Sequence, residues 1–416
     1  MKYVVIGASA AGISGCRELR KHDKDAEITL ISKDDKIYSR CILHHYVHGT
    51  RDLKQLEFME DNFIETKNIN WISGVAATKV DAENKKVMLE DGREVEFDKL
   101  LIATGAHTFF PPIPHLREAK NSIGFRNIDD AEIIMEEAKK DEVKHIVIMG
   151  AGLIGIDVIT GLLDYGKELA LVEMQNRMLS IQLDKRAAST YEDAFRERGV
   201  KQYYEKGAKE LLVDEEGKIT GILLTSGEII PCDLLVCCAG VRSNMEFLEG
   251  SGIECDRFGV IIDETGKTNI DDIYAAGDVT GRTPIWPIAT KQGLIAANNM
   301  TGIESNIMNY FDSKFFTSTS TMNFLGIPTM SLGINTPPDD TYEVTTYDDG
   351  VNYKKVIHKD GIIEGAILQG DISYGGVLNQ LIARKIDTRR IKKPIYSIDY
   401  SDFFNEDEKY RFSYSE

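Results

Sequence analysis

Two glycine-rich turns, each placed between a strand-like run and a helix-like run, constrain the fold of this chain most strongly. The first unit spans Lys2–Ile31 with its turn at Gly7–Gly12, and the second spans His145–Glu173 with its turn at Gly150–Gly155. One such turn is weak evidence, because glycine is common in tight turns for steric reasons alone. Two turns in the same order of strand, turn, helix and strand predict an α/β chain with two Rossmann-like dinucleotide-binding units.

The first turn is expected to present backbone N–H groups and a helix N-terminus to a pyrophosphate, because small residues let the backbone approach the ligand. The residues predicted to line it are Gly7, Ser9, Ala11 and Gly12. Ser9 stands at a position where such a turn usually has glycine. A carboxylate that holds a ribose usually ends the second strand of such a unit. Here Ser32 stands at that place, followed by Lys33, Asp34 and Asp35, and which of these meets the ribose stays open. The predicted contacts are Ser32, Lys33 and Asp34.

The second unit has glycine at all three places of its turn and an acidic residue, Glu173, at the end of its second strand. A carboxylate there accepts hydrogen bonds from both ribose hydroxyls and repels a 2′-phosphate. No arginine follows directly, since three residues intervene before Arg177, so the sequence favours NADH over NADPH. The alternative interpretation of Glu173 is an ordinary surface glutamate. The residues predicted to bind the nucleotide here are Gly150, Gly152, Leu153, Ile154, Gly155 and Glu173.

The formal charge of −18 over 416 residues repels phosphate backbones and anionic lipid, so we expect no nucleic-acid and no membrane partner. The strand-like run at Lys2–Ile6 leaves no room for a signal peptide before it, and no apolar stretch approaches the length of a membrane span. The six cysteines include no C-x-x-C pair and no metal-ligand cluster. We therefore expect a soluble, cytoplasmic protein without a bound metal.

Further motifs extend the pattern along the chain. In order, they are G-A-S-A-A-G, A-T-G-A, G-A-G-L-I-G, C-A-G-V-R-S-N and Y-A-A-G-D-V. Together they resemble the FAD-dependent pyridine nucleotide-disulfide oxidoreductases over essentially the whole chain. The resemblance implies an α/β fold of two nested Rossmann-like domains, for FAD and NAD(P), with an α+β C-terminal interface domain. The implied boundaries are 1–110 and 246–308 for the FAD-binding domain, 111–245 for the NAD(H)-binding domain and 309–416 for the C-terminal dimerisation domain.

The same resemblance assigns cofactor contacts outside the two glycine turns. The Y-A-A-G-D motif places Asp278 on the ribityl chain of FAD, and the stretch Phe125–Asp130 resembles an F-R-x-x-x-D motif whose arginine contacts FAD. The stretch Pro287–Gly293 resembles a helix start that points at the flavin N1 and C2 carbonyl, where negative charge develops on reduction. The contacts implied in this way are Arg40, Ala77, Thr104, Gly105, Arg126, Gly240, Gly277, Asp278 and Ala289.

The stretch Tyr38–Gly49, which in this family forms the helix beside the flavin, separates the subfamilies. Glutathione-type and lipoamide-type reductases need two cysteines separated by four residues, and thioredoxin reductases need a C-x-x-C; the chain has neither. Cys41–Tyr46 resembles the C-x-L-x-x-Y pattern of CoA-disulfide reductases and NADH oxidases, whose cysteine is redox active. Tyr38–Arg40 instead resembles the Y-x-R motif of rubredoxin reductases, putidaredoxin-type reductases and nitrite reductase flavoproteins. In putidaredoxin-type enzymes a lysine near flavin N5 falls at His44 of this chain.

The sequence therefore predicts an FAD-dependent NADH oxidoreductase, with Cys41 and His44 as candidate catalytic residues. The first hypothesis is electron transfer between NADH and a small iron or iron–sulfur carrier protein, such as rubredoxin or a ferredoxin-like protein, which supplies the metal. The second is a CoA-disulfide reductase or NADH oxidase that works through Cys41. The third is a flavin-bearing assembly subunit with a vestigial NAD site. By resemblance, the region from about Tyr310 is expected to form the face of a homodimer.

Overall fold

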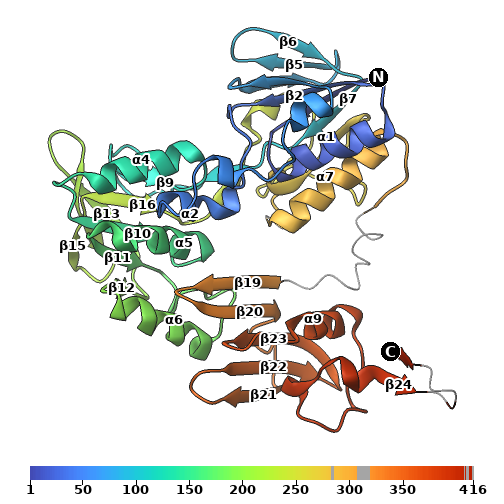
Figure 1. Ribbon diagram of the computed structural model, residues 1–416. Coiled ribbons are helices and arrows are strands. Elements are labelled where there is room, and N and C mark those ends of the chain that lie inside the picture. The colour runs from blue at the N-terminus through green and yellow to red at the C-terminus, as the bar shows by residue number, and fades with distance from the viewer. Residues whose placement is uncertain (283–284, 307–318, 407, 409–411, 415–416) are drawn as a thin grey trace. The chain divides into compact units, whose positions relative to one another are not determined.

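The computed structural model describes residues 1–282, 285–306, 319–406, 408 and 412–414. The chain forms two compact units, whose elements are labelled in Figure 1. Unit 1 comprises Met1–Phe110, Gly124–Met135 and the described part of Ala239–Tyr310, and unit 2 comprises Pro111–Ile123, Glu136–Cys238 and the described part of Phe311–Glu416. The domain boundary expected at 308/309 lies outside the described residues. The other expected boundaries stay predictions.

Unit 1 is built on a parallel five-stranded sheet in the order β18-β7-β1-β2-β3. Its strands are β1 (Lys2–Ile6), β2 (Glu27–Ser32), β3 (Ile69–Ser73), β7 (Lys99–Ile102) and β18 (Ile273–Ala275). Central parallel strands are covered on both faces, and β1 and β7 accordingly read as nearly continuous apolar runs. Helices α1 (Ala10–His22) and α7 (Trp286–Met300) lie side by side against the sheet (Figure 1).

The two faces of this sheet pack against different elements, because successive side chains of a strand point in opposite directions. Val5 and Leu101 belong to the apolar core shared with α1 and α7. Val4 and Leu100 belong to a second core, shared with a small antiparallel sheet. The strands of that small sheet are β4 (Ala77–Asp81), β5 (Lys86–Leu89) and β6 (Glu94–Glu96). Unit 1 therefore has three layers, of helices, parallel sheet and antiparallel sheet.

Short elements complete unit 1. They are α2 (Leu43–Val47), α3 (Phe63–Thr66) and the antiparallel pair β8 (Ala106–Thr108) and β17 (Val241–Ser243). Strand β9 (Ser122–Gly124) and helix α4 (Ile128–Lys139) each contain a boundary between the two units. The β8–β17 pair joins two chain segments that are far apart in the sequence.

The nucleotide-binding part of unit 2 repeats the plan of unit 1. Its sheet has the order β12-β11-β10-β16-β9, with parallel pairing from β12 to β16. Its elements are β10 (His145–Met149), α5 (Leu153–Leu162), β11 (Glu168–Val172), α6 (Lys185–Glu197), β12 (Lys201–Tyr203) and β16 (Leu234–Cys237). An antiparallel sheet of β13 (Ala208–Val213), β14 (Ile219–Leu224) and β15 (Ile229–Pro231) follows.

The C-terminal part of unit 2 is an antiparallel sheet in the order β19-β20-β23-β22-β21. Its elements are β19 (Thr319–Phe324), β20 (Ile327–Gly333), β21 (Glu343–Asp348), β22 (Tyr353–Lys359), β23 (Ile362–Gln369) and α9 (Gly375–Arg384), followed by β24 (Phe404–Glu406) and β25 (Phe412–Tyr414). Helix α9 packs on the sheet through an apolar core. The sheet also meets α6, where the Tyr191 hydroxyl donates to Thr329 Oγ1 at 2.7 Å.

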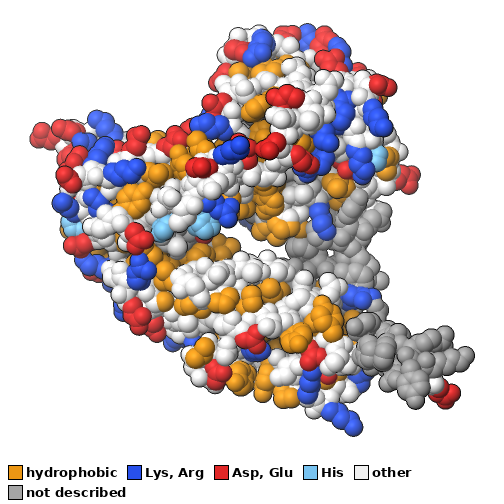
Figure 2. Space-filling model, in the orientation of Figure 1, with side chains coloured by type: hydrophobic (Ala, Val, Ile, Leu, Met, Phe, Trp, Pro, Cys, Tyr) orange, Lys and Arg blue, Asp and Glu red, His pale blue; other side chains and the backbone are white. Residues whose placement is uncertain are grey.

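These parallel sheets with flanking helices and the C-terminal antiparallel sheet confirm the predicted α/β fold with an α+β C-terminal part. None of the helices in the described ranges combines the length and the apolar composition that a membrane crossing requires. On the face drawn in Figure 2, acidic and basic side chains are interspersed. The net negative charge is therefore not gathered into one acidic patch on that face.

Candidate functional site: two dinucleotide cradles

The first cradle lies where β1 turns into α1, and two of its glycines are required by sterics. Gly7 has a φ of +113°, and a Cβ there would lie 2.1 Å from the carbonyl oxygen of Ala103. A Cβ on Gly12 would lie 1.8 Å from the carbonyl oxygen of Gly7. Ser9 is the N-cap of α1, but its side chain makes no capping hydrogen bond. The cap side chain therefore does not occupy the first N–H groups of α1, which can receive a pyrophosphate.

Three residues predicted to bind the cofactor from separate parts of the sequence meet beside α1. Gly277 has a φ of +81°, and a Cβ there would lie 3.0 Å from the Ala11 Cβ and 3.4 Å from the Ala289 Cβ. The Gly277 N–H donates to Gln292 Oε1 at 2.8 Å, so a buried amide of α7 fixes this turn. The sequence reasoning missed Gln292, although it lies within the stretch assigned to the flavin-facing helix.

Arg126 and Asp278 form an ion pair, with 2.5 Å between Nη2 and Oδ2 and with side chains 21% and 15% exposed. Arg126 Nε also donates to the carbonyl oxygen of Ala106 at 3.1 Å. The backbone N–H groups of Arg126 and Asn127 donate to Asp130 Oδ2 at 2.8 and 3.2 Å. Burial raises the pKa of Asp130 even though these N–H groups oppose the rise. The F-R-x-x-x-D motif is therefore held together by its own hydrogen bonds, and its arginine side chain is directed toward Asp278.

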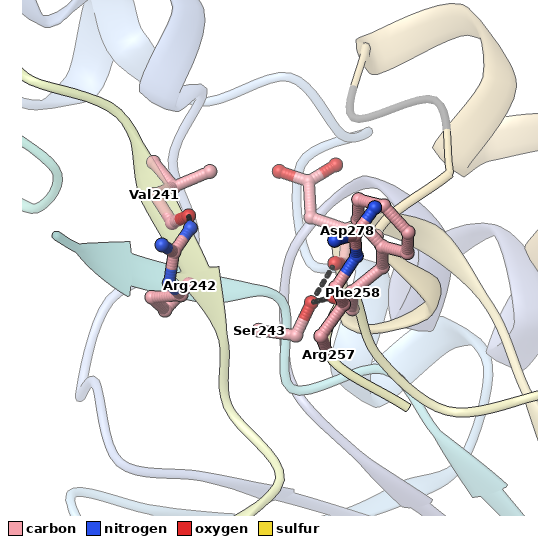
Figure 3. A pocket seen from close by; sticks show the side chains of 7 residues that line it. Val241, Arg242, Ser243, Arg257, Phe258 and Asp278 are labelled. Atoms are coloured by element: carbon pink, nitrogen blue, oxygen red, sulfur yellow. Dashed lines mark hydrogen bonds between the residues drawn. The ribbon is translucent and has the colours of Figure 1, made fainter. Parts of the chain in front are cut away.

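The backbone of Asp278 is held from its other side. The Ser243 hydroxyl is placed 2.9 Å from the carbonyl oxygen of Asp278 and 2.6 Å from that of Phe258. Figure 3 shows these bonds at the edge of a small hollow. The hollow is lined by Val241, Arg242, Ser243, Arg257, Phe258, Asp278 and Gly281. Asp278 is thus fixed through both its carboxylate and its main chain, as a residue that must orient a ligand needs to be.

Thr104 is paired with Asn244, the last residue of the C-A-G-V-R-S-N motif. The Thr104 hydroxyl donates to the Asn244 carbonyl oxygen at 2.8 Å, and Asn244 Nδ2 donates to the Thr104 carbonyl oxygen at 2.9 Å. Asn244 Oδ1 lies 2.7 Å from His107 Nδ1. Gly105 follows with a φ of +67°. Asn244 was not among the predicted site residues, because a motif match does not show which distant residue an amide contacts.

The three ribose candidates at the end of β2 have different environments. Ser32 is buried, donates to the carbonyl oxygen of Asp34 at 2.7 Å and accepts from Trp71 Nε1 at 2.9 Å. Lys33 is exposed. Asp34 is half-buried and forms an ion pair with Arg40. Ser32 is therefore committed to protein partners, and Asp34 carries the only carboxylate among the three.

Two other residues predicted to contact FAD lie on neighbouring elements. The guanidinium of Arg40 lies 4.9 Å from the ring centroid of Tyr38, whose hydroxyl accepts from the Ile128 N–H at 2.9 Å. Ala77 begins β4 and is half-buried against the core between the two sheets of unit 1. The Tyr38–Arg40 motif is thus part of a packed cluster at the end of β2.

The candidate catalytic residues lie on a short helical segment after that cluster. Cys41 is exposed on the 3₁₀ turn Arg40–Ile42, and His44 lies half-buried in α2. Burial, together with the nearby positive charges of His45, Arg51 and His48, lowers the pKa of His44 to about 4. The His44 imidazole is therefore neutral near pH 7, so it can donate or accept one hydrogen bond but supplies no positive charge.

The second cradle, in unit 2, has the same steric requirement for glycine as the first. Gly150 has a φ of +110°, and a Cβ on Gly155 would lie 1.9 Å from the carbonyl oxygen of Gly150. Gly152 is the N-cap of α5, and a Cβ there would meet nothing within 4 Å. Leu153 and Ile154 are half-buried in the first turn of α5. The middle position of the turn thus faces open space, where a ligand can approach the backbone.

Glu173 is bound to the glycine turn rather than extended into solvent. Its Oε2 accepts from the Ala151 N–H at 2.7 Å and its Oε1 accepts from the Gln175 N–H at 2.7 Å. Each carboxylate oxygen has a further lone pair, so ribose hydroxyls can still be accepted. Arg177 is engaged elsewhere, because its Nε donates to the Leu183 carbonyl oxygen at 2.9 Å. Gly240, which lies in unit 1 with a φ of +112°, has no atom within 4 Å of its Cβ position.

Both cradles thus fit a dinucleotide. Each has a turn whose close backbone contacts require glycine, a helix N-terminus without a side-chain cap, and polar groups held in place nearby. Within the residues that the structure describes, no group of three or more His, Cys, Asp and Glu side chains is arranged to hold a metal ion. All six cysteines are present as thiols, and the adjacent Cys237 and Cys238 are buried and half-buried.

Comparison with known protein families gives two matches. Residues 1–293 match the pyridine nucleotide-disulphide oxidoreductase family. Residues 319–386 match the rubredoxin NAD+ reductase C-terminal domain. The first match contains both glycine turns, and the second contains the C-terminal sheet and α9.

Individual relatives extend over nearly the whole chain. The NADH-dependent phenylglyoxylate dehydrogenase subunit epsilon of Aromatoleum evansii is 29% identical and matches over 93% of this chain and 92% of its own. The NADH-rubredoxin oxidoreductase of Clostridium acetobutylicum is 27% identical over 92% of this chain and 94% of its own. Among solved structures, a NAD-dependent persulfide reductase from A. fulgidus has a TM-score of 0.82 at 25% identity and covers 95% of this chain and 79% of its own.

Proposed function

The chain belongs to the pyridine nucleotide-disulphide oxidoreductase family, whose members use FAD and NAD(H), and we propose that this member passes electrons between NADH and a small iron or iron–sulfur carrier protein. The observation that carries the proposal is the match of residues 319–386 to the rubredoxin NAD+ reductase C-terminal domain. The relative named NADH-rubredoxin oxidoreductase matches through both the nucleotide-binding and the C-terminal parts, which supports the same choice.

In this proposal unit 1 holds FAD. The N-terminus of α1 receives the pyrophosphate, and Arg126 pairs with the Asp278 carboxylate and holds it in an orientation toward the ribityl chain. The first turn of α7 contains no acidic residue, so its N–H groups are free of a competing negative charge and can stabilise the flavin N1 region through the helix dipole. When bound, FAD would supply the chemistry that links two-electron exchange with NADH to one-electron exchange with a carrier.

Unit 2 holds NADH. The N-terminus of α5 binds the pyrophosphate, and Glu173 accepts the ribose hydroxyls with an orientation fixed by Ala151 and Gln175. A 2′-phosphate would meet the Glu173 carboxylate, while Arg177 donates to main-chain oxygens of its own segment. These contacts favour NADH over NADPH. His44 acts as a neutral hydrogen-bonding group near the flavin and does not replace the charge of a lysine.

The cellular setting follows from the same chemistry. We place the protein in the cytoplasm, because NADH is available there and because the sequence has the cysteine pattern of a reducing compartment. The proposed assembly is a homodimer formed through the C-terminal domain. The carrier protein supplies the metal centre.

A second candidate function is a CoA-disulfide reductase or NADH oxidase. The observation in its favour is that the Cys41 thiol is exposed three residues before His44, on the segment assigned to the flavin. The structural neighbour named a NAD-dependent persulfide reductase carries out sulfur chemistry on the same fold. Cys41 would then be the nucleophile, and its thiolate the reactive form.

One experiment separates the two functions. The FAD-loaded Cys41→Ser variant is compared with wild type for NADH-driven reduction of rubredoxin, of CoA disulfide and of oxygen. Cys255→Ser is the matched control, because Cys255 is also exposed but lies far along the chain. The first proposal predicts unchanged rubredoxin reduction in both variants. Loss of all NADH-dependent turnover in Cys41→Ser alone, with FAD retained, supports the thiol function instead.

A further inference from the structure

The segment that follows Glu173 is held mainly by hydrogen bonds to its own main chain and to other parts of unit 2. This segment, Met174–Asp184, links β11 to α6. Two of its large apolar side chains, Met174 and Ile181, are 76% and 84% exposed. Arg177 holds the segment from within, since its Nε donates to the Leu183 carbonyl oxygen at 2.9 Å and its Nη2 to the Ser180 carbonyl oxygen at 3.1 Å.

The C-terminal part of unit 2 contacts the carbonyl oxygens of this segment. Asn335, just after β20, donates through Nδ2 to the Ile181 carbonyl oxygen at 2.7 Å and to the Ser180 carbonyl oxygen at 3.2 Å. The Ser331 hydroxyl donates to the Gln182 carbonyl oxygen at 2.5 Å. One residue of the C-terminal part, just after β20, thus binds two successive carbonyl groups of the segment.

Asn335 is itself held by a nearly buried ion pair. Lys355 Nζ donates to the Asn335 carbonyl oxygen at 2.9 Å and to Asp184 Oδ2 at 3.0 Å. The side chains of Lys355 and Asp184 are 10% and 16% exposed, and the Tyr353 hydroxyl also donates to Asp184 at 2.7 Å. Because several bonds fix both ends of the contact, the position of Asn335 relative to the segment is well defined.

The segment in turn is bound to the glycine turn of the nucleotide cradle. The Leu179 N–H donates to the Ala151 carbonyl oxygen at 2.8 Å. On the other side of the same residue, the Ala151 N–H donates to Glu173 Oε2 at 2.7 Å. Leu179 is 1% exposed, so water cannot readily replace its bond. A continuous set of contacts therefore leads from Asn335 through the segment to Ala151 and the carboxylate that is expected to hold the ribose.

We propose that Asn335 is a positioning residue for NADH, through which the C-terminal domain sets the geometry of the Glu173 carboxylate and the 150–155 turn. This inference rests on the proposed NADH site. It assigns the C-terminal domain a part in nucleotide binding, in addition to any part in contacts with other proteins. Its effect is on affinity for the nucleotide, because the contacts lead to Ala151 and Glu173, the groups expected to hold the pyrophosphate and the ribose.

The test uses the FAD-loaded Asn335→Ala variant. Losing one amide donor to two carbonyl groups is expected to raise the Kd and the KM for NADH by about three- to tenfold. The kcat at saturating NADH and the FAD content should not change. Hydrogen exchange at the Leu179 amide should accelerate in the variant, which reports on the segment without relying on turnover.

Arg186→Ala is the matched control. Arg186 in α6 pairs with Asp348 at 2.6 Å and lies over the Tyr353 ring, so its removal also breaks contacts between the two parts of unit 2. It removes none of the hydrogen bonds that Asn335 and Arg177 make to the 174–184 segment. The control should keep wild-type NADH affinity and Leu179 exchange. If Asn335→Ala binds NADH as tightly as the wild type and exchange at Leu179 is unchanged, the positioning role is wrong. If the wild type itself fails to bind NADH, the proposed function fails first and the inference with it.

Discussion

The two glycine turns of this chain have nearly the same backbone but differ in what lies beside it. Gly7 and Gly150 have φ values of +113° and +110°. A Cβ on the last glycine of each turn would lie 1.8 or 1.9 Å from the carbonyl oxygen of the first. The middle positions differ, since one is serine and the other is a glycine that faces open space. The fold therefore requires glycine at the two outer positions of each turn. At the middle position the fold does not require glycine, so the choice of residue there can depend on ligand binding.

The strand ends beyond the two turns differ more. At the end of β2, Ser32 is buried among protein partners. At the end of β11, Glu173 is bound to its own turn through Ala151 and can still accept a ligand. In unit 1 the fixed carboxylate comes instead from Asp278, paired with Arg126. In the proposed assignment, the carboxylate that contacts the ligand thus lies at the strand end in unit 2 and on a distant motif in unit 1.

The largest effect should come from the glycines that the fold requires. Gly12→Ala and Gly155→Ala each place a Cβ within 2 Å of a backbone oxygen, which only a shift of the main chain can relieve. We expect each to lower the free energy of unfolding by about 3 kcal/mol. Gly152→Ala is the matched control, because its φ is −77° and the added Cβ meets nothing within 4 Å. Urea unfolding measures all three, and equal losses would remove the distinction between outer and middle positions.

The next effect concerns the strand ends. Glu173→Ala removes the acceptor of the ribose hydroxyls, and we expect the KM for NADH to rise roughly 10- to 100-fold while FAD remains bound. The preference for NADH over NADPH should also shrink, because the charge that repels a 2′-phosphate is gone. Ser32→Ala at the equivalent place in unit 1 should leave the KM for NADH unchanged. Steady-state kinetics with NADH and with NADPH measure both changes. An unaltered KM for NADH in Glu173→Ala would contradict the assignment of Glu173 to the ribose.

Asp278→Asn tests whether unit 1 depends on its distant carboxylate. The substitution keeps the side-chain shape but removes the charge that pairs with Arg126 and leaves that guanidinium without a counter-ion. We expect the Kd for FAD to rise about tenfold, with NADH affinity in unit 2 unchanged. Titration of the FAD-depleted protein with FAD measures the change. A variant that binds FAD as the wild type does would show that the pair supports only the fold.

The effect that is smallest near neutral pH is a pH dependence of the stability of unit 1. His44 has a folded-state pKa of about 4, below its ordinary value of 6.5, because burial disfavours the charged form. The unfolded chain therefore binds the proton more readily, and stability is full above about pH 6.5 and falls as the pH drops toward 4. The slope from this one group is at most about 1.4 kcal/mol per pH unit. His44→Gln should flatten the curve of unfolding free energy against pH, and an unchanged curve would contradict the buried, neutral state of His44.

Much of the fold could be predicted from the sequence, because its signals are local. An apolar run ending in Gly7 or Gly150 specifies a buried strand and a turn with positive φ within a few residues. Long-range partners carry no such signal. Gln292 fixes Gly277, and Asn244 locks Thr104, across 15 and 140 positions of the sequence. These pairs depend on how the helices and strands pack, which no periodicity in a single sequence records.

For the candidate site, too, local motifs predicted individual residues, whereas the contacts between those residues could not be predicted. The motifs identified Arg126 and Asp278 separately, but only the structure shows that their side chains form an ion pair. The three ribose candidates after β2 could not be ranked from the sequence, since the partners of Ser32 include Trp71 from another strand. The contact of Asn335 with the 174–184 segment had no sequence signal at all, because main-chain carbonyl groups accept bonds whatever their side chains are.

The most direct test of the account is anaerobic titration of the purified protein with NADH, followed through the visible absorbance of its flavin. We expect a yellow protein with one FAD per chain, whose colour is bleached by one equivalent of NADH per FAD and restored when oxidised rubredoxin is added. A colourless protein that takes up no added FAD would contradict the first cradle, and a yellow protein that NADH does not bleach would contradict the second.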